Sequence, residues 1–365
     1  MAAGKYKGSD VFGTLLTKNV PHILEKIFFS LDYTSLKKCH EVCITWHEIL
    51  ISEAFQKKAT TLFHEEILQD EEKLYQAAGL GNTYKIRKIL FSGMVDINCE
   101  RRLLWKGTPS YEAAFYNHKH FIKLLLERGA DIGQAQNLGP TPLHAAAKLC
   151  HEDVVKLLID SGANPNKADQ DGLTPLSWAA KKGKKSILQV LLDGGADPNS
   201  ACKDGQTALY SSAWRGHKDV VQVLLDRGAE CDKVDARGWT PIHGAACYGR
   251  QAVVKVLLDR GAQPDKADKD GDTPLHVAAH HKHEGVVRVL LDGGANPNKA
   301  DKDGQTPLNV ALKQGQKDII QLLKVLLDGG ADPNIADGEG KTLLHWALLK
   351  KRKDVVNFLK DSGAV

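Results

Sequence analysis

Residues 273–298 read TPLHVAAHHKHEGVVRVLLDGGANPN, and this stretch decides the fold. It joins a threonine-proline start, a pair of small residues, a run of paired aliphatics and a Gly-Ala-Asn-Pro turn. The starting threonine recurs every 33 residues (141 − 108 = 33, 306 − 273 = 33), and once more after 36 (342 − 306 = 36). The series is Thr108, Thr141, Thr174, Thr207, Thr240, Thr273, Thr306 and Thr342. A fixed period of this length indicates a chain built from stacked repeats.

Each residue type in the repeat has a physical reason for its place. The threonine hydroxyl is expected to accept a backbone N–H at the start of a first helix, and the proline beside it suits the first turn. Small pairs such as Ala278-Ala279 let neighbouring helices approach closely. The paired aliphatics fall on one face of a second helix, and the glycine of the Gly-Ala pair ends that helix in a left-handed conformation.

The motif TPLH at residues 141–144 and 273–276, which reads TPIH at 240–243, resembles with its period of 33 the ankyrin repeat. The resemblance implies an all-α fold over residues 74–365, an α-solenoid of about nine repeats with β-turn fingers. One repeat is too short to be stable alone, so stability must come from stacking against its neighbours. The first repeat, residues 74–98, lacks the threonine and proline, as expected of a repeat that caps the stack.

A different pattern precedes the repeats. We expect a disordered tail over residues 1–17, three short helices over 18–55 and a helical linker over 56–73. The linker carries apolar residues at helical spacing and has no Gly, Pro or Ser-rich tract, which favours a rigid connection. Three helices of this size bury little apolar surface, so their remaining apolar side chains predict a partner.

The N-terminal helices carry the pattern Pro21-x-Ile23-Leu24-x-x-Ile27-Phe28-x-x-Leu31-Asp32-x-x-x-Leu36, followed by Val42-Cys43-x-x-Trp46. This pattern resembles the F-box. The resemblance implies that the helices bind a Skp adaptor, which links the chain to a cullin. Carried over by position, the adaptor-binding residues are Pro21, Ile23, Leu24, Ile27, Phe28, Leu31, Leu36, Val42, Cys43 and Trp46. The alternative interpretation is a helical cap on the ankyrin stack, with the same residues buried inside it.

The ankyrin resemblance also implies a binding face, formed by the fingers and the exposed ends of the first helices. Aromatic and arginine side chains, which dominate interface hot spots, gather in the fifth and sixth repeats. The candidate target-binding residues are Lys181, Lys182, Trp214, Arg215, Arg237, Trp239, Tyr248, His280 and His281. The alternative is that the aromatics pack on adjacent helices and form no site.

Two other tryptophans are expected in the core. Trp178 and Trp346 both follow their threonine by four residues, where other repeats have Val277 and Val310. The segment from His280 to His283 is expected to be a solvated helix end rather than a metal site, because no cysteine or carboxylate in the sequence completes a ligand set.

Composition limits the function. Hydrophobic residues are 42% of the 365, the net charge is +4, and charges of both signs are interleaved, which argues against a nucleic-acid or membrane surface. No run of apolar residues reaches the length of a membrane helix, and residues 1–10 lack the apolar core of a signal peptide. Seven cysteines without a CxxC pair favour a reducing cytosol or nucleus and no zinc or disulfide framework.

No set of nucleophile, base and orienting residue is present, so we expect no catalysis, cofactor or metal. The interpretation that combines both resemblances is a substrate-recognition subunit of an SCF-type ubiquitin ligase. Its F-box would bind the Skp adaptor and its ankyrin repeats would bind a protein target. The alternative is an ankyrin scaffold or sequestering inhibitor with no ubiquitin-ligase association.

Overall fold

The computed structural model describes residues 73, 74, 76, 97–98, 108–133, 139–313 and 319–365. The chain divides into two compact units, Met1–Gln76 with Ile86–Asp96, and Ala77–Lys85 with Ile97–Val365. Nearly all described residues belong to the second unit. The predicted tail, F-box-like helices and linker, and all ten adaptor-binding residues, lie outside the described residues.

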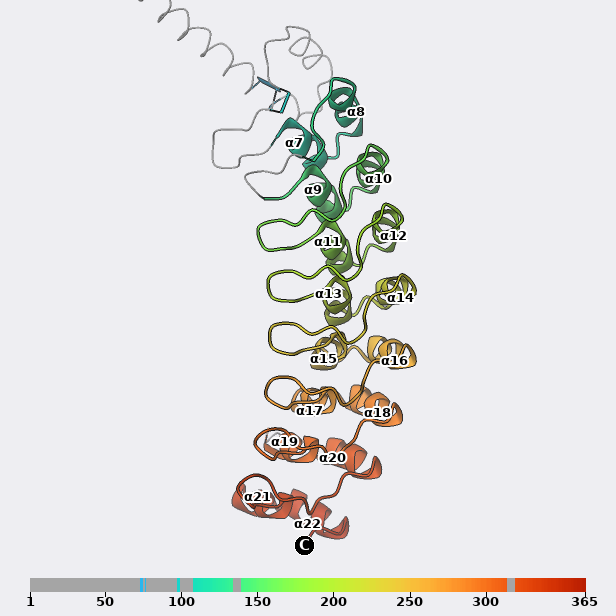
Figure 1. Ribbon diagram of the computed structural model, residues 1–365. Helices are drawn as coiled ribbons and strands as arrows, with labels where there is room; N and C mark the ends of the chain where they lie inside the picture. The colour runs from blue at the N-terminus through green and yellow to red at the C-terminus, as the bar shows by residue number, and fades with distance from the viewer. Residues whose placement is uncertain (1–72, 75, 77–96, 99–107, 134–138, 314–318) are drawn as a thin grey trace, which may run out of the picture. The chain divides into compact units, whose positions relative to one another are not determined.

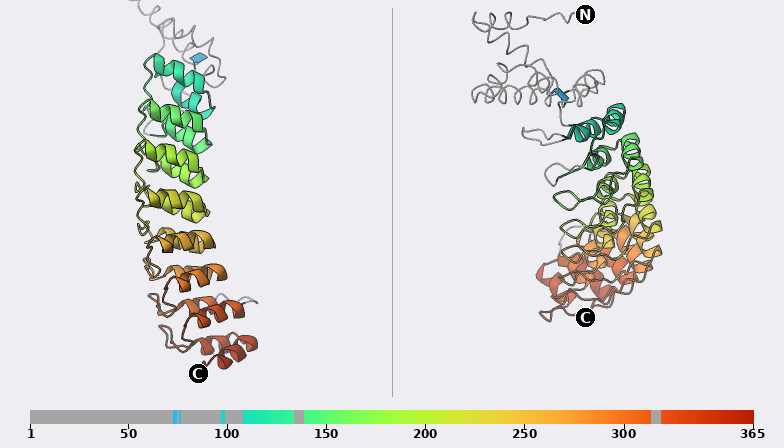
Figure 2. Two further views of the ribbon diagram at one scale, coloured as in Figure 1. Left: turned by 90° about the vertical axis from the view of Figure 1, so that its right-hand side faces the viewer. Right: turned by 45° about the horizontal axis from the view of Figure 1, so that its top comes forward.

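The second unit is built from helix pairs, one pair per repeat, and its described residues form no strand. Figures 1 and 2 show the first helix of each pair in one layer and the second helix in another, with a finger loop beside each first helix. The first-layer helices are α7 (Pro109–Phe115), α9 (Pro142–Leu149), α11 (Pro175–Lys182), α13 (Ala208–Arg215), α15 (Pro241–Cys247), α17 (Pro274–His280), α19 (Pro307–Lys313) and α21 (Leu343–Leu349). The second-layer helices are α8 (Lys119–Glu127), α10 (Glu152–Asp160), α12 (Lys185–Asp193), α14 (Lys218–Asp226), α16 (Gln251–Asp259), α18 (Glu284–Asp292), α20 (Ile319–Asp328) and α22 (Lys353–Asp361).

The repeat threonines start the first-layer helices as the sequence predicts. The hydroxyl of Thr207 accepts the Tyr210 N–H at 3.1 Å, and the hydroxyl of Thr108 accepts the Tyr111 N–H at 3.2 Å. Each threonine has an extended backbone, and the residue after it begins the helix. Such a cap contributes about 1 kcal/mol to the stability of a helix.

The core lies between the two layers. Ala145 and Ala146 of α9 and Val154, Val155 and Leu158 of α10 are at most 3% exposed, and so are Ile187, Leu188 and Leu191 at the matching positions of α12. Burying one such aliphatic side chain stabilises the fold by about 1.5–3 kcal/mol. The apolar residues that recur every 33 positions therefore form a series of buried layers, and each layer lies between two neighbouring repeats.

The backbone takes a left-handed conformation where the two helices of a repeat meet, and several repeats place glycine there. Gly183 follows α11 with φ +70°, the left-handed region that glycine tolerates best. A Cβ atom there would lie 2.6 Å from Nδ1 of His217 in the next repeat. Glycine at 183 therefore suits both the backbone conformation and the close approach of His217, whereas Cys150 adopts the same left-handed conformation one repeat earlier.

Asparagines in the turns after the second-layer helices join neighbouring repeats. Asn166 donates from Nδ2 to the carbonyl oxygen of Gly195 at 2.9 Å and accepts the Asp197 N–H at 2.7 Å. Asn199 makes the same two bonds one repeat later. The Asn-Pro-Asn and Asp-Pro-Asn turns are thus part of the link between repeats.

Buried histidines of the TPLH motif form a second set of links. Nδ1 of His243 accepts the Thr240 N–H at 3.2 Å, and Nε2 lies 3.2 Å from the carbonyl oxygen of Asp272 in the next repeat. Because a backbone N–H occupies Nδ1, the ring is neutral and donates its Nε2 proton to that carbonyl. Burial lowers the pKa of His243 to about 4. His144 and His276 make the equivalent contacts, and burial lowers the pKa of both.

The eighth repeat departs from this pattern, because Asn309 stands where the histidine would be. The Thr306 hydroxyl donates to Oδ1 of Asn309 at 2.9 Å. Nδ2 of Asn309 is buried and has no partner among the described residues, so the link to the ninth repeat is missing. A buried donor without an acceptor costs about 1–3 kcal/mol.

We therefore expect Asn309→His to stabilise the chain by about 1 kcal/mol, because the imidazole would supply the missing link to the carbonyl oxygen of Lys341. The measurement is the midpoint of urea unfolding followed by circular dichroism. The matched control is His276→Asn in the preceding repeat, which should lower the midpoint. An unchanged or lower midpoint for Asn309→His would show that the histidine link does not stabilise this joint.

An aspartate shapes each of five fingers. Oδ1 of Asp235 accepts the N–H groups of Arg237 and Trp239 at 2.8 and 2.9 Å. The aspartates that accept the equivalent pair of N–H groups in other repeats are Asp169, Asp268, Asp301 and Asp337. The second carboxylate oxygen, Oδ2, can then accept hydrogen bonds from side chains, as it does in Asp235 and Asp337. We call the surface made by the fingers and the first-layer helices the inner face.

Candidate target-binding face

The predicted aromatic residues of the fifth and sixth repeats lie together on the inner face. Trp214 lies in the last turn of α13, and Tyr248 follows α15; their rings meet edge to face with centroids 5.2 Å apart. Tyr248 is 47% exposed and Trp214 is half-buried. With Trp239 they line a hollow of ≈ 460 Å³. The three rings offer a partner a broad apolar surface with defined edges, which suits an interface anchor.

Arg237 is fixed beside these rings. Its guanidinium lies over the Trp239 ring at 4.3 Å, donates to Oδ2 of Asp235 at 3.0 Å and donates to the Tyr210 hydroxyl at 2.9 Å. The Arg237 side chain is 57% exposed, whereas that of Asp235 is 2% exposed. The group is therefore held in one orientation while part of it faces solvent, so binding a partner would cost it little side-chain entropy.

Tyr210 belongs to this cluster although the sequence reasoning passed over it. Its side chain is 4% exposed, and burial raises the pKa of its hydroxyl to about 12. The signal lay in the motif itself, since Thr207-Ala208-Leu209-Tyr210 replaces the histidine of TPLH by a tyrosine. The hydroxyl reaches Arg237 of the next finger, at the motif position from which histidine links repeats.

Arg215 lies next to the hollow but does not line it. Its guanidinium lies over the Trp214 ring at 4.9 Å, and the side chain is exposed. The carbonyl oxygen of Trp214 accepts from Nε of Arg250 at 3.3 Å. Trp214 therefore has a fixed backbone and an arginine beside its ring, which extends the cationic rim of the hollow.

A second hollow, of ≈ 420 Å³, adjoins the first across Trp239. Its lining includes Asp272, His280, His281 and Lys313. Burial, and then the negative charges of four neighbouring aspartates, raise the pKa of Asp272 to about 6. The finger side of this hollow is therefore strongly acidic, whereas its helix side carries the two exposed histidines.

The exposed histidines at the end of α17 have a cysteine neighbour in the preceding repeat, which spacing in the sequence did not indicate. Sγ of Cys247 lies 3.4 Å from Nε2 of His281, one repeat away, and the rings of His280 and His281 meet edge to face at 4.8 Å. Sequence spacing could not show this pair because 34 residues separate its members. The described residues contain no group of three His, Cys, Asp or Glu side chains placed to hold a metal.

Trp178 was predicted to lie in the core, and this is wrong. Its ring is half-buried on the inner face, with Nζ of Lys148 at 4.6 Å and Nζ of Lys181 at 5.2 Å from the ring centroid. The fourth position after the threonine lies on the side of the helix toward the inner face, and neighbouring residues do not fully cover a side chain as large as tryptophan there. Lys181 is half-buried and Lys182 is exposed on the same helix.

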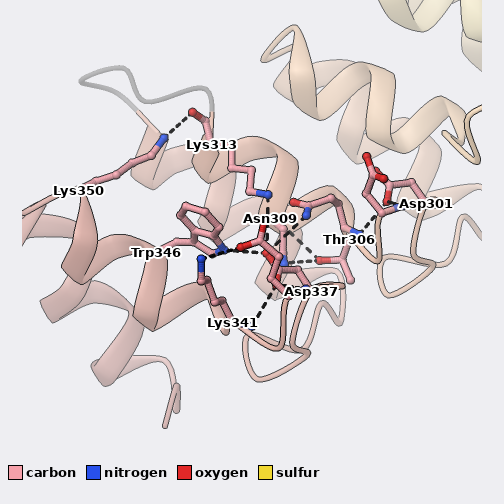
Figure 3. Close-up of polar contacts among 11 residues, drawn as sticks. Asp301, Thr306, Asn309, Lys313, Asp337, Lys341, Trp346 and Lys350 are labelled. Carbon is pink, nitrogen blue, oxygen red and sulfur yellow. Dashed lines mark hydrogen bonds and ion pairs between the residues drawn. The ribbon is translucent and has the colours of Figure 1, made fainter.

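Trp346 was also predicted to lie in the core and is half-buried on the inner face instead (Figure 3). Its Nε1 donates to Oδ2 of Asp337 at 2.8 Å, and Lys313 and Lys341 lie over its ring at 4.6 and 4.8 Å. Burial alone would raise the pKa of Asp337, but the hydrogen bonds to its carboxylate and the charge of Lys313 lower it to about 2. This carboxylate is therefore ionised at neutral pH.

Within the described ranges, no helix has the length and apolar character needed to cross a membrane.

The repeat geometry and the sequence agree with one family. A family model described as ankyrin repeats matches residues 74–169, 162–235, 228–301 and 293–365, so the chain belongs to the ankyrin-repeat family. Ankyrin repeats indicate a protein–protein interaction scaffold, generally without catalytic activity, and no enzyme family is indicated. A comparison with curated proteins found no match.

Two solved structures resemble the stack. The crystal structure of the human ASB11 ankyrin repeat domain is 28% identical, covering 62% of this chain and 100% of that one, with a TM-score of 0.55. The ankyrin repeat domain of Bcl-3, described as a unique member of the IkappaB protein family, is 29% identical, covering 60% of this chain and 98% of that one, with a TM-score of 0.54. Both likenesses concern ankyrin repeats.

Proposed function

We propose that the chain is the substrate-recognition subunit of an SCF-type ubiquitin ligase in the cytosol or nucleus. The inner face of its ankyrin repeats binds the protein target. The F-box-like residues 18–55 bind a Skp adaptor and through it a cullin, and residues 56–73 connect the two parts. The chain itself catalyses no reaction.

The observation that carries target binding is the joined pair of hollows around Trp239. Aromatic rings, the fixed guanidinium of Arg237 and the exposed histidines line these hollows on the inner face. Hot-spot residues of protein interfaces are enriched in tryptophan, tyrosine and arginine. A cluster of partly exposed tryptophans needs a reason on a protein surface, and a partner supplies one.

The ligase part of the proposal is supported by sequence. A helical period alone would account for the spacing of Ile23, Ile27 and Leu31, but not for the Val42-Cys43-x-x-Trp46 string that follows. These positions match the F-box pattern over residues 19–50. Apolar side chains on three short helices are more than such a small core can bury.

The test is binding of the purified full-length chain to a Skp adaptor by titration calorimetry. We expect the intact chain to bind and Leu24→Ala with Ile27→Ala to reduce the affinity by at least about a hundredfold, because two buried aliphatic contacts are lost. The matched control is Trp214→Ala with Trp239→Ala, which should leave adaptor binding unchanged. Absence of binding by the intact, folded chain would remove the ligase function and favour a scaffold or sequestering inhibitor.

A further inference from the structure

The inner face contains two tryptophans in the same register, each beside a lysine of the preceding repeat. Trp178 and Trp346 both follow their threonine by four residues, and Lys148 and Lys313 both follow theirs by seven. Each lysine ammonium lies 4.6 Å from the centroid of its tryptophan ring. The two sites are therefore copies of one arrangement at different places in the stack.

The copy at Trp346 is neutralised within the chain. Oδ2 of Asp337 accepts the indole N–H at 2.8 Å and lies 3.6 Å from Nζ of Lys313. Lys341, on the same ring, pairs with Glu339 at 2.6 Å. Figure 3 shows the carboxylate of Asp337 between the Trp346 indole and the Lys313 ammonium. A carboxylate is thus the group that completes this arrangement.

The copy at Trp178 has no such carboxylate. Among the described residues the Trp178 indole N–H makes no hydrogen bond, and Lys148, Lys181 and Lys182 make no ion pair within 4.0 Å. The aspartate equivalent to Asp337 is Asp169, which accepts two backbone N–H groups and is half-exposed rather than buried. Residues 134–138, which fall outside the described ranges, read QAQNL and contain no acid.

We propose that Trp178, Lys148 and Lys181 bind an aspartate or glutamate side chain of the target, in the role that Asp337 has beside Trp346. The partner is therefore an acidic peptide segment that crosses the third and fourth repeats. This inference deepens the proposed function, because it rests on the inner face being the target-binding surface. It does not depend on the Skp adaptor.

Charge and donor count favour a carboxylate over a nucleic-acid backbone. The site offers one indole N–H and two ammonium groups, which matches the two oxygens of one carboxylate and adds charge-assisted hydrogen bonds. Three lysines exceed the two carboxylates of the adjacent finger, Asp169 and Asp171, by one charge. A nucleic-acid backbone would need a longer basic track, and the inner face turns acidic at Asp272.

The experiment is titration of the full-length, ¹⁵N-labelled chain with a polyglutamate peptide at low salt, observing the indole N–H resonances of the tryptophans. The Trp178 resonance should shift, and Lys148→Gln should weaken binding about tenfold, as expected for one charge-assisted contact. The matched control is Lys341→Gln at the neutralised copy, where Lys341 pairs with Glu339. This variant should leave the affinity unchanged. Circular dichroism checks that both variants fold.

Three results would overturn the inference. The first is absence of binding or an unmoved Trp178 resonance. The second is a Trp178 indole resonance that shifts in the Asp169→Asn variant but not on addition of the peptide. In that case the carboxylate of Asp169 would already neutralise the lysines beside Trp178. The third is tighter binding of oligothymidylate than of polyglutamate at this resonance. If the chain binds polyglutamate but does not bind the Skp adaptor, the ligase function is removed and this inference still stands.

Discussion

We expect the stack to unfold at a lower urea concentration at pH 4 than at neutral pH, with His243 alone lowering the free energy of unfolding by about 3 kcal/mol. The reason is that the pKa of this histidine is about 4 in the fold, against 6.5 for an unperturbed histidine. Between these values the unfolded chain binds a proton that the folded chain excludes. Stability is therefore fully present above pH 6.5 and is lost as the pH falls toward 4. His144 and His276 act in the same direction.

One group opposes this trend and provides the control. The pKa of Asp272 is raised to about 6, so acidification below that value stabilises the fold at this position. Asp272→Asn should therefore steepen the loss of stability on acidification, whereas His243→Ala should flatten it. The measurement is urea unfolding at a series of pH values, followed by circular dichroism. Equal pH dependence of the intact chain and His243→Ala would contradict a neutral, buried His243.

We expect replacement of both Trp214 and Trp239 by alanine to reduce the affinity for the target by at least about a hundredfold. Each ring is the kind of residue whose truncation costs about 2 kcal/mol or more in an interface, and 1.4 kcal/mol is a factor of ten. Trp239 also donates from Nε1 to Oδ2 of Asp268 at 2.8 Å. Its replacement therefore also removes a hydrogen bond that holds the edge of the first hollow in place.

The measurement is the dissociation constant for a target first identified by capture with the intact chain. The matched control is Trp346→Val, which removes a tryptophan from the same face at a site that Asp337 already completes. That variant should lower stability and leave the affinity for the target unchanged. An equal affinity for the Trp214 and Trp239 double variant would place the binding surface elsewhere.

The repeat fold of the described residues from Thr108 onward could be predicted because each repeat carries residues that start and end its helices. Threonine and proline start α9, a left-handed glycine ends α10, and the aliphatics between them have one period. Stacking then needs no contact between distant residues except those of adjacent repeats. The histidine links were harder to predict, because only the structure shows Nε2 of His276 reaching the Gln305 carbonyl.

The candidate site was predictable in position and less so in chemistry. Counting from the threonine correctly placed Trp214, Trp239 and Tyr248 on one surface. The same counting misjudged Trp178, since a position that buries valine does not have room to cover an indole. Contacts between a finger and the first-layer helix of the preceding repeat, such as Arg237 with Tyr210 of α13, depend on the rise from one repeat to the next and have no signature in spacing.

The central claim is that one chain holds a ligase adaptor at one end and a target on its inner face, independently. Affinity capture from cell extract tests it most directly, comparing the intact chain with Leu24→Ala, Ile27→Ala and with Trp214→Ala, Trp239→Ala. We predict that the first pair loses the Skp adaptor and cullin and keeps the target, and that the second pair does the reverse. Retention of adaptor and cullin by the first pair, or loss of both kinds of partner by either pair, would contradict the account.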